Sequence, residues 1–539
     1  MTPSFGTPNF GTPSFSSAAV AAPHTAACEA GQAILKAGGN ALEAMVAVAS
    51  TIAAVYPHMN GIGGDSFWII SEPSGRVRYI EACGFAGEHA TIERYKALGL
   101  DSIPVRGPQA TLTVPGTLGG WQIALDIAKE NGGKLPLDML LHHAIAATRE
   151  GHSVGASEAR YIIKEDKSLL DLPFFKEMYY VDGKQPTAGH MRTLPALAAT
   201  FQHLADAGLD DFYRGDIARE MALDLERAGT PITRADLARY RAIERAPLAA
   251  RLKDCTVYMP QPPSQGFAAL LMLGIFDELA IKRGESVEHF HGLIESVKRA
   301  NTIRDDIVTD FDRLTGEPAD HLTRERFQHG AAQINMGRAA VWPLPTPQHG
   351  DTIWAGAIDS NGMAVSLIQS VFWEYGSGVV LPNTGILMQN RGLGLSLDPR
   401  SKNALKPGRR PFHTLHAPMA VFDDGRICSY GSMGGEVQPQ ITSNLFLRYA
   451  RFGQSPTQAL DAPRLTFGRS WGAERATVKT ESRIDPSLIA ALRKLGHEVE
   501  ESSQPYADSF GHAGMLVKHP DGHVLADHDP RADGGAMGL

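Results

Sequence analysis

A threonine follows Gly-Asp near the start of HGDTIWAGAIDSNGMAVSLIQS, residues 349–370. The runs TIWAGAID and MAVSLIQS are rich in β-formers and joined by Ser-Asn-Gly, so they predict a tight hairpin that opens on Thr352. Ser370 ends the return strand, and the hairpin would bring its hydroxyl beside that of Thr352. Further along, Gly434 and Gly435 in GSMGGE offer a bare backbone pair able to aim N–H groups at an oxyanion.

The chemistry that fits this set is nucleophilic attack by a hydroxyl. A threonine hydroxyl is a weak nucleophile at neutral pH and needs a neighbouring base. One solution is the residue's own α-amine, which is freed when the bond before it is cut. Asp351-Thr352 is therefore predicted as a self-processing site behind a flexible loop. A threonine that opens a strand is otherwise only a good β-former, and the nearby hydroxyl and glycine pair decide against that interpretation.

Two other motifs favour structural roles. GIGGD, residues 61–65, lacks the ending of a phosphate-binding loop and the spacing of a dinucleotide fingerprint, so it predicts a tight loop before a strand. EHFHGLIE offers His289, His291 and Glu295, but metal sites usually need three or more converging ligands and no H-E-x-x-H pattern is present. No G-x-S-x-G elbow occurs. We therefore expect neither a metal nor a cofactor.

The composition is that of an ordinary globular protein, with 43% hydrophobic and 20% charged residues. A net charge of -8 disfavours a nucleic-acid partner. The four cysteines lie far apart with no C-x-x-C pair, which favours a reducing compartment. The N-terminal segment lacks the features of a signal peptide, and the most apolar run is too short to span a membrane. We expect a cytoplasmic protein without membrane contact, whose residues 1–26 form a flexible tail.

Helical patterns dominate the first part of the chain and strand patterns its end. Residues 27–55 predict two helices separated at Gly38-Gly39-Asn40. Residues 63–82 predict two strands around a Pro-Ser-Gly turn. After a loop rich in Pro and Gly at residues 336–350, strand patterns take over, with one further helix in PSLIAALRKLG. This order predicts α+β layers that share one core.

Together with NGIGGDSFW, VPGTLGGW, QPPSQGFAALLML and RRPFHTLHAPM, these residues resemble the γ-glutamyltransferase family of N-terminal nucleophile hydrolases. The resemblance implies a four-layer αββα sandwich made as one proenzyme. It implies cleavage before Thr352, giving a large subunit (27–351 after the tail) and a small subunit (352–539) that share one domain. The subunits would form a heterodimer, or a dimer of heterodimers. Thr352 matches the nucleophile, Ser370 the hydroxyl that hydrogen-bonds to it, and the glycine pair the oxyanion hole.

The departures from the family pattern concern the substrate. The family's arginine for the α-carboxylate falls at Ala90, and its acidic residue for the α-amino group falls at Gly394. Four further positions, which hold an asparagine, a glutamine and a serine pair in the family, are occupied here by Phe372, Arg391, His413 and Thr414. The pocket has therefore lost its anchor for an α-ammonium group.

The new side chains imply a small substrate. Phe372 should shrink the pocket, and Arg391 is a planar fork suited to a carboxylate. The implied substrate is a compact amide that bears a carboxylate. The resemblance is to the branch of the family that hydrolyses oxamate to oxalate and ammonia in purine nitrogen salvage. The pattern leaves open whether His413 contacts the substrate or only supports its loop.

Two alternatives remain at the level of sequence. A γ-glutamyl hydrolase or transferase, or a relative similar to cephalosporin and glutaryl acylases, would use the same nucleophile on a longer acyl group. A catalytically silent binding protein on the same fold is the alternative of a different class. The intact set of Thr352, Ser370 and Gly434-Gly435 argues against silence, because a scaffold has no need of all of them.

Overall fold

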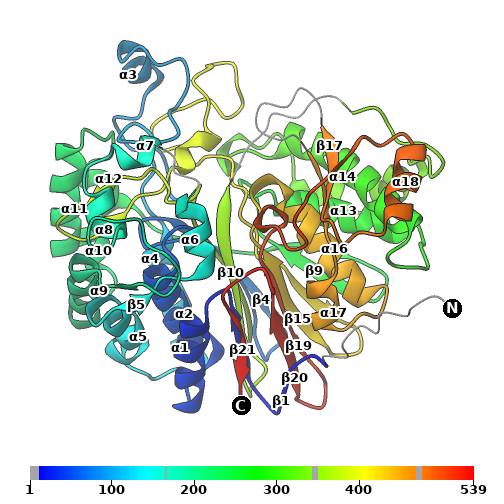
Figure 1. Cartoon of the computed structure of the whole chain (residues 1–539), viewed down its shortest axis with the longest axis horizontal. Coiled ribbons are helices and arrows are strands. Elements are labelled where there is room, and N and C mark those ends of the chain that lie inside the picture. Colours follow the sequence, from blue (N-terminus) through cyan, green and yellow to red (C-terminus); the bar gives the residue numbers. More distant parts are fainter. Residues whose placement is uncertain (1–10, 164–166, 343–349, 469–475) are drawn as a thin grey trace.

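Two seven-stranded sheets lie face to face, and helices cover the outer face of each (Figure 1). The computed structural model describes residues 11–163, 167–342, 350–468 and 476–539. Helices α1 (Thr25–Lys36), α2 (Ala41–Val55), α4 (Thr117–Glu130) and α5 (Leu137–Arg149) lie on one side of the sheets (Figure 1). Helices α13 (Gly266–Glu278), α14 (Val287–Ile307), α16 (Gln438–Ala450) and α17 (Pro456–Asp461) lie on the other. The layers are therefore αββα, and the predicted fold class is confirmed.

The first sheet contains the predicted hairpin. Its strands, in order, are β21 (Gly535–Gly538), β2 (Ala19–Ala22), β10 (Asp351–Ile358), β11 (Ala364–Phe372), β3 (Asp65–Ser71), β4 (Val77–Ala82) and β7 (Ile243–Arg245). All neighbours in this sheet are antiparallel. Every residue of β3 and β11 is buried, because helices cover one face and the second sheet covers the other.

The second sheet collects strands from both parts of the chain. Its order is β1 (Ser14–Phe15), β20 (Val524–His528), β19 (Ala513–Lys518), β15 (Ile427–Ser432), β14 (Met419–Phe422), β9 (Cys255–Met259) and β8 (Leu248–Arg251). Apolar side chains from both sheets, among them Phe67, Trp354 and Leu516, fill the space between them. Burial of this surface is the main term that holds the layers together.

The two helices predicted in residues 27–55 are present, whereas α16 and α17 lie in the part of the chain where strand patterns were predicted. The first layer has α1 (Thr25–Lys36), α2 (Ala41–Val55), α4 (Thr117–Glu130), α5 (Leu137–Arg149) and α9 (Pro195–Ala207). The second has α13 (Gly266–Glu278), α14 (Val287–Ile307), α16 (Gln438–Ala450) and α17 (Pro456–Asp461). Asn40 caps α2, as its position in the predicted break suggests, and its side chain accepts from the backbone N–H of Glu43. None of the described helices is long and apolar enough to cross a bilayer.

Shorter elements connect these layers. The remaining helices are α3 (Ile92–Ala97), α6 (Ala156–Ile163), α7 (Lys167–Leu170), α8 (Phe175–Tyr179), α10 (Asp211–Arg214), α11 (Asp216–Arg227), α12 (Arg234–Arg239), α15 (Arg324–Ala332) and α18 (Pro486–Lys494). The remaining strands form three small sheets: β5 (His152–Ser153) with β6 (Met191–Arg192), β12 (Val380–Leu381) with β13 (Ile386–Leu387), and β16 (Leu465–Gly468) with β17 (Thr477–Thr480) and β18 (Val499–Glu501).

The predicted flexible tail, residues 1–26, is wrong over its described part. β1 pairs with β20, and β2 lies between β21 and β10. All four residues of β2 are buried, because this short run of Ala and Val is small and apolar enough to fit between α1 and the second sheet. The many Pro, Gly, Ser and Thr residues before this run give the segment the composition of a flexible tail, so the strand was not predicted. Residues 1–10 lie outside the described residues, as does the stretch 343–349 of the predicted loop.

Trp354 fixes the distance between the two sheets near the start of β10. Its indole lies against Gly431 of β15 and Gly514 of β19, where an added Cβ would come within 2.1 Å and 2.2 Å of ring atoms. Its Nε1 donates to Ser366 Oγ at 2.9 Å. The two glycines therefore make room for the indole directly beside the hairpin.

We predict that Gly431→Ala lowers the midpoint of thermal unfolding. The methyl group would overlap the indole of Trp354, and overpacking of a closed core costs about 1–3 kcal/mol. Gly316→Ala is the matched control, because a Cβ at Gly316 meets no heavy atom within 4 Å. Equal midpoints for the two variants in a calorimetric scan would contradict this account.

Candidate active site

Thr352 lies at a β-bulge in the hairpin of β10 and β11. The register shifts between Asp351 and Ile353, so that Thr352 faces two residues of β11, Ser370 and Val371. Such bulges turn a side chain out of the regular strand pattern. The Thr352 side chain is buried, and its Oγ1 has no hydrogen-bond partner among the described residues. An unused hydroxyl in a buried bulge is what a nucleophile requires before substrate arrives.

Ser370 lies beside Thr352 as predicted, but the two hydroxyls are not hydrogen-bonded in the uncleaved chain. Ser370 Oγ instead accepts from the backbone N–H of Phe372 at 2.7 Å. Phe372 itself has a φ of +85°, in the left-handed region. The Ser370–Thr352 hydrogen bond that the resemblance implies is thus absent from the uncleaved chain, and for the cleaved chain it stays a prediction.

Phe372 and Arg391 stack on each other. The guanidinium carbon of Arg391 lies 3.5 Å from the centroid of the Phe372 ring, a cation–π contact. A positive φ is costly for a bulky residue and persists only where the surroundings hold it. Here the stack and the Ser370 hydrogen bond hold Phe372. Phe372 thus lies beside Arg391 in a strained conformation, and its narrowing of the substrate pocket stays a prediction.

Arg391 begins the short helix η3 (Arg391–Gly394) and is almost fully buried. Its Nη1 donates to Thr414 Oγ1 at 3.1 Å, whereas its Nη2 has no partner among the described residues. Burial lowers the pKa of Arg391 to about 9, and the nearby Asp65 carboxyl opposes this shift. A buried guanidinium with unused N–H groups is a site for an anion.

Asp65, the first residue of β3, was not among the predicted site residues. Its Oδ2 lies 3.1 Å from His413 Nε2. Its Oδ1 accepts three hydrogen bonds, from the backbone N–H of Gly84 at 3.0 Å, that of Gly116 at 3.1 Å and Gln389 Nε2 at 3.0 Å. GIGGD does form the expected loop before a strand, but the pattern gave no sign that its aspartate would bind His413.

The charges of this pair are set by burial. Burial raises the pKa of Asp65 to about 7, against the hydrogen bond from Gln389 and the charge of Arg391. Burial, followed by the charge of Arg391, lowers the pKa of His413 well below its usual range. The His413 ring is therefore neutral, and its Nδ1 has no partner among the described residues.

These contacts form a closed ring around Thr352. In strand register, Phe372 is opposite Asp351, the residue before Thr352. The stack leads from Phe372 to Arg391, and the hydrogen bonds lead on to Thr414, His413 and Asp65. Asp65 is in turn the cross-strand partner of Ser370, which faces Thr352. The structure thus brings together all four predicted substrate-binding residues and the predicted nucleophile.

The predicted oxyanion pair joins the ring through Gln265. Gly434 and Gly435 have positive φ values of 138° and 53° and lead into η4 (Gly435–Val437) and α16. Gln265, at the start of α13, donates from Nε2 to the carbonyls of Thr414 at 2.9 Å and Gly435 at 2.8 Å. Its Oε1 accepts from Arg304 at 3.1 Å. Sequence reasoning missed Gln265, because nothing local marks a glutamine whose partners are about 150 residues away.

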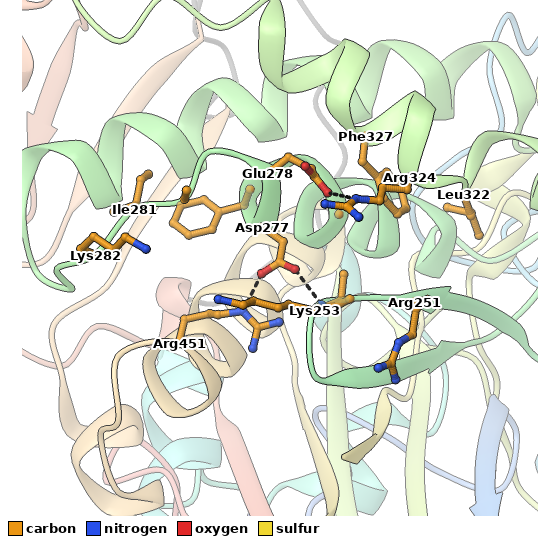
Figure 2. Close-up of a pocket in the computed structure, with 14 residues that line it drawn as sticks. Arg251, Lys253, Asp277, Glu278, Ile281, Lys282, Leu322, Arg324, Phe327 and Arg451 are labelled. Carbon is orange, nitrogen blue, oxygen red and sulfur yellow. Dashed lines mark hydrogen bonds and ion pairs between the residues drawn. The ribbon is translucent and has the colours of Figure 1, made fainter. Parts of the chain in front are cut away.

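A cavity of about 620 Å³ lies at the other end of α13 (Figure 2). Asp277 there accepts from Arg451 and from the backbone N–H of Lys253, and Glu278 pairs with Arg324. An α-helix rises about 1.5 Å per residue, so the helix places this cavity roughly 20 Å from Gln265. It is not part of the ring around Thr352.

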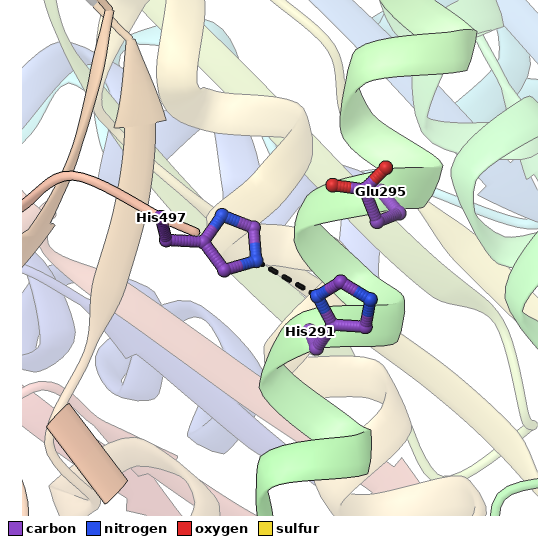
Figure 3. Close-up of side chains that lie close together, drawn as sticks. All are labelled: His291, Glu295 and His497. Carbon is purple, nitrogen blue, oxygen red and sulfur yellow. Dashed lines mark hydrogen bonds between the residues drawn. The ribbon is translucent and has the colours of Figure 1, made fainter. Parts of the chain in front are cut away.

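His291 and Glu295 meet His497 in a buried cluster (Figure 3). His291 Nδ1 lies 2.8 Å from His497 Nε2, and its Nε2 lies 2.9 Å from the carbonyl of Asn335. Glu295 is paired with Lys298 at 2.7 Å. These groups have protein partners and connect the segment near Asn335 to α14. Their ligand atoms also lie within 4.8 Å of one another, so the structural role of His291 and Glu295 stays a prediction.

Comparison with known proteins identifies the relatives of this site. The model of the gamma-glutamyltranspeptidase family matches residues 27–539. The chain belongs to this family. It is 44% identical to the oxamate amidohydrolase proenzyme of Klebsiella pneumoniae, over 96% of this chain and 97% of that protein. It is 35% identical to a glutathione hydrolase-like proenzyme of Bacillus subtilis, over 96% of this chain and 98% of that protein.

The solved structures agree with the family. The crystal structure of a cephalosporin acylase from Bacillus halodurans matches with a TM-score of 0.89 and 30% identity, and the match covers 100% of this chain and 99% of that chain. The expectations of an N-terminal nucleophile hydrolase fold and of an amide-cleaving enzyme of this family are confirmed. These relatives argue against the alternative of a catalytically silent binding protein.

We predict that Gly435→Ala impairs the site more than the strain of a positive φ explains. A Cβ at Gly435 would lie 2.8 Å from both the backbone N and O of Gly350, two residues before Thr352. Gly453→Ala is the matched control, since Gly453 has a φ of +70° and open space around it. Only Gly435→Ala should lose turnover, because the shift that relieves this overlap would displace the N–H of residue 435, and complete loss of an oxyanion donor costs roughly a hundred- to a thousand-fold. Similar turnover numbers in the two folded variants would contradict the role of Gly435.

Proposed function

We propose that the chain is a proenzyme that cuts itself between Asp351 and Thr352 and then hydrolyses oxamate to oxalate and ammonia. The observation that carries this proposal is the buried guanidinium of Arg391, stacked on Phe372 in the same ring as Thr352. Nη2 of Arg391 has no partner among the described residues and could bind a carboxylate. The 44% identity to an oxamate amidohydrolase proenzyme supports the same substrate.

The self-cleavage step would use the hydroxyl of Thr352. Its Oγ adds to the carbonyl carbon of Asp351, and breakage of the C–N bond leaves an ester and a free α-amine on Thr352. Water then hydrolyses the ester and releases the new carboxyl end at Asp351. The freed amine is the base that the buried threonine otherwise lacks.

Amide hydrolysis would repeat the same chemistry on oxamate. Arg391 binds the carboxylate, and Thr352 Oγ adds to the amide carbon while its proton passes to the α-amine. The N–H groups of Gly434 and Gly435 bind the oxyanion. The C–N bond breaks, the nitrogen takes the proton from the amine and leaves as ammonia, and water hydrolyses the oxalyl ester to oxalate.

The longer acyl groups of the alternative substrates fit the site less well. A γ-glutamyl group carries an α-ammonium, which the cation of Arg391 would repel. The carboxyl of Asp65 is already bonded to His413, Gln389 and two backbone N–H groups. Phe372 also stands where the family has a smaller asparagine. We further propose that the enzyme is a hydrolase rather than a transferase, and that the two subunits split at Asp351 remain one heterodimer. The enzyme would be cytoplasmic and would act in purine nitrogen salvage.

We predict that Thr352→Ala gives a single uncut chain without amidase activity. The wild-type protein should give two bands on a denaturing gel, and N-terminal sequencing of the smaller band should begin Thr-Ile-Trp. Thr384→Ala is the control, because this residue is equally buried and also has an Oγ1 without a partner among the described residues. An uncut wild type with full activity would overturn the proposed cleavage.

We predict that Arg391→Met abolishes most oxamate turnover in a chain that still cleaves itself. Loss of a charge-assisted pair in a closed pocket costs on the order of 2–5 kcal/mol. Arg391→Lys should recover only part of the activity, because an ammonium keeps the charge but loses the planar fork. Ammonia release from oxamate is measured beside release from glutamine. A wide preference of the wild type for glutamine would show that the proposed substrate is wrong.

A further inference from the structure

One ring nitrogen of His413, Nδ1, is buried and makes no hydrogen bond to the part of the chain that the structure describes. The whole side chain is fully buried. A buried polar atom without a partner destabilises the folded state. Natural structures tolerate such atoms mainly at functional sites, and the atom lies within the ring around Thr352.

Asp65 determines which His413 nitrogen carries the proton. Three N–H groups donate to Asp65 Oδ1, and the remaining oxygen faces His413 Nε2 at 3.1 Å. Above the pKa of Asp65, about 7, its ionised carboxylate can only accept, so Nε2 carries the ring proton there and Nδ1 is a bare lone pair. The edge of the ring also packs on Phe67, with centroids 4.7 Å apart and planes at 81°, which fixes its orientation.

The backbone holds the same residue firmly. The N–H of His413 donates to the carbonyl of Pro263 at 2.8 Å, and its carbonyl accepts from the N–H of Gln265 at 2.8 Å. Gln265 is also the residue that binds the carbonyl of Gly435. His413 is therefore held to the oxyanion glycine on one side and, through the adjacent Thr414, to Arg391 on the other.

We infer that Asp65 and His413 act as a dyad whose Nδ1 accepts a hydrogen bond from the amide NH₂ of the substrate. The inference rests on the proposed function, and it adds the group that recognises a primary amide. Arg391 would bind one end of the substrate, and His413 the nitrogen at the other end. Asp65 is then a positioning residue that acts through His413.

The dyad gains and loses no proton in the reaction. As Thr352 Oγ bonds to the amide carbon, Nδ1 keeps the nitrogen lone pair turned toward the protonated α-amine of Thr352. The C–N bond breaks, the amine supplies the third hydrogen, and ammonia departs. In the second half of the reaction, the same Nδ1 accepts from the water that attacks the oxalyl ester.

Asp65→Asn tests the dyad with little change of shape. The amide oxygen can keep the three N–H donors at Oδ1, while the amide NH₂ must then face His413 Nε2. That nitrogen becomes the acceptor, and Nδ1 becomes a donor that opposes the substrate NH₂. Oxamate is compared with monoethyl oxalate. Attack on that compound forms the same oxalyl ester on Thr352, but its leaving group is ethanol and it carries no N–H. Assays are run above the Asp65 pKa of about 7.

Asp65→Asn should lower kcat/KM for oxamate roughly ten- to a hundred-fold, as expected when a buried donor is left facing another donor, and far less for the ester. Asp236→Asn is the matched control, because Asp236 is as buried and also accepts several hydrogen bonds, outside the ring. It should leave the amide-to-ester ratio unchanged. Equal losses on both substrates in Asp65→Asn would show a purely structural role and overturn the dyad.

Nitrogen-15 spectra of labelled histidine test the dyad without substrate. The wild type should show a bare Nδ1 and a protonated Nε2 for His413, and Asp65→Asn should reverse them. A protonated Nδ1 in the wild type would overturn the inference. If the wild type hydrolyses glutamine and a γ-glutamyl ester but neither oxalyl compound, the oxamate proposal fails, and the dyad is decided by the same amide-to-ester comparison on the γ-glutamyl pair.

Discussion

The buried carboxyl of Asp65, bonded to His413 and close to the charge of Arg391, is the constraint on which the site depends. Neither the carboxyl nor the guanidinium is accessible to water in the uncleaved chain, and a buried charge is stable only with hydrogen bonds and an opposite charge nearby. The loops that carry Gly84, Gly116 and Gln389 supply those hydrogen bonds to Asp65. Segments far apart in the sequence must therefore meet at one carboxylate before the site exists.

The strain at Phe372 couples this charged centre to the hairpin. A left-handed backbone costs of order 1–3 kcal/mol for such a residue, and the fold offsets it by stacking the ring on Arg391. In the uncleaved chain, the Ser370 hydroxyl accepts a hydrogen bond from the N–H of Phe372 and makes none with Thr352 Oγ1. Phe372 thus contacts both groups: its ring stacks on the guanidinium of Arg391, and its N–H binds the hydroxyl of Ser370.

Local patterns predicted the elements well and the contacts less well. The hairpin that opens on Thr352 follows from alternation and an Asn-Gly turn, which are properties of neighbouring residues. β2 was missed because a strand of four small residues is defined only by its partners, β10 and β21. Asp65 and Gln265 were missed for the same reason, since their hydrogen-bond partners come from distant segments. Arg391 was found through its departure from a family pattern, and its stack on Phe372 required the structure.

The uncleaved chain also bears on how one site would serve the two proposed reactions. An added Cβ at Gly350 would come within 2.7 Å of the Phe372 ring, and one at Gly435 would come within 2.8 Å of the Gly350 backbone. The segment before Thr352 therefore lies against both the pocket wall and the oxyanion glycine. On the proposed cleavage, that segment is the first acyl group the site processes, and its departure is what opens the place between Phe372 and Gly435. A pocket vacated by a short piece of backbone suits an acyl group of a few atoms.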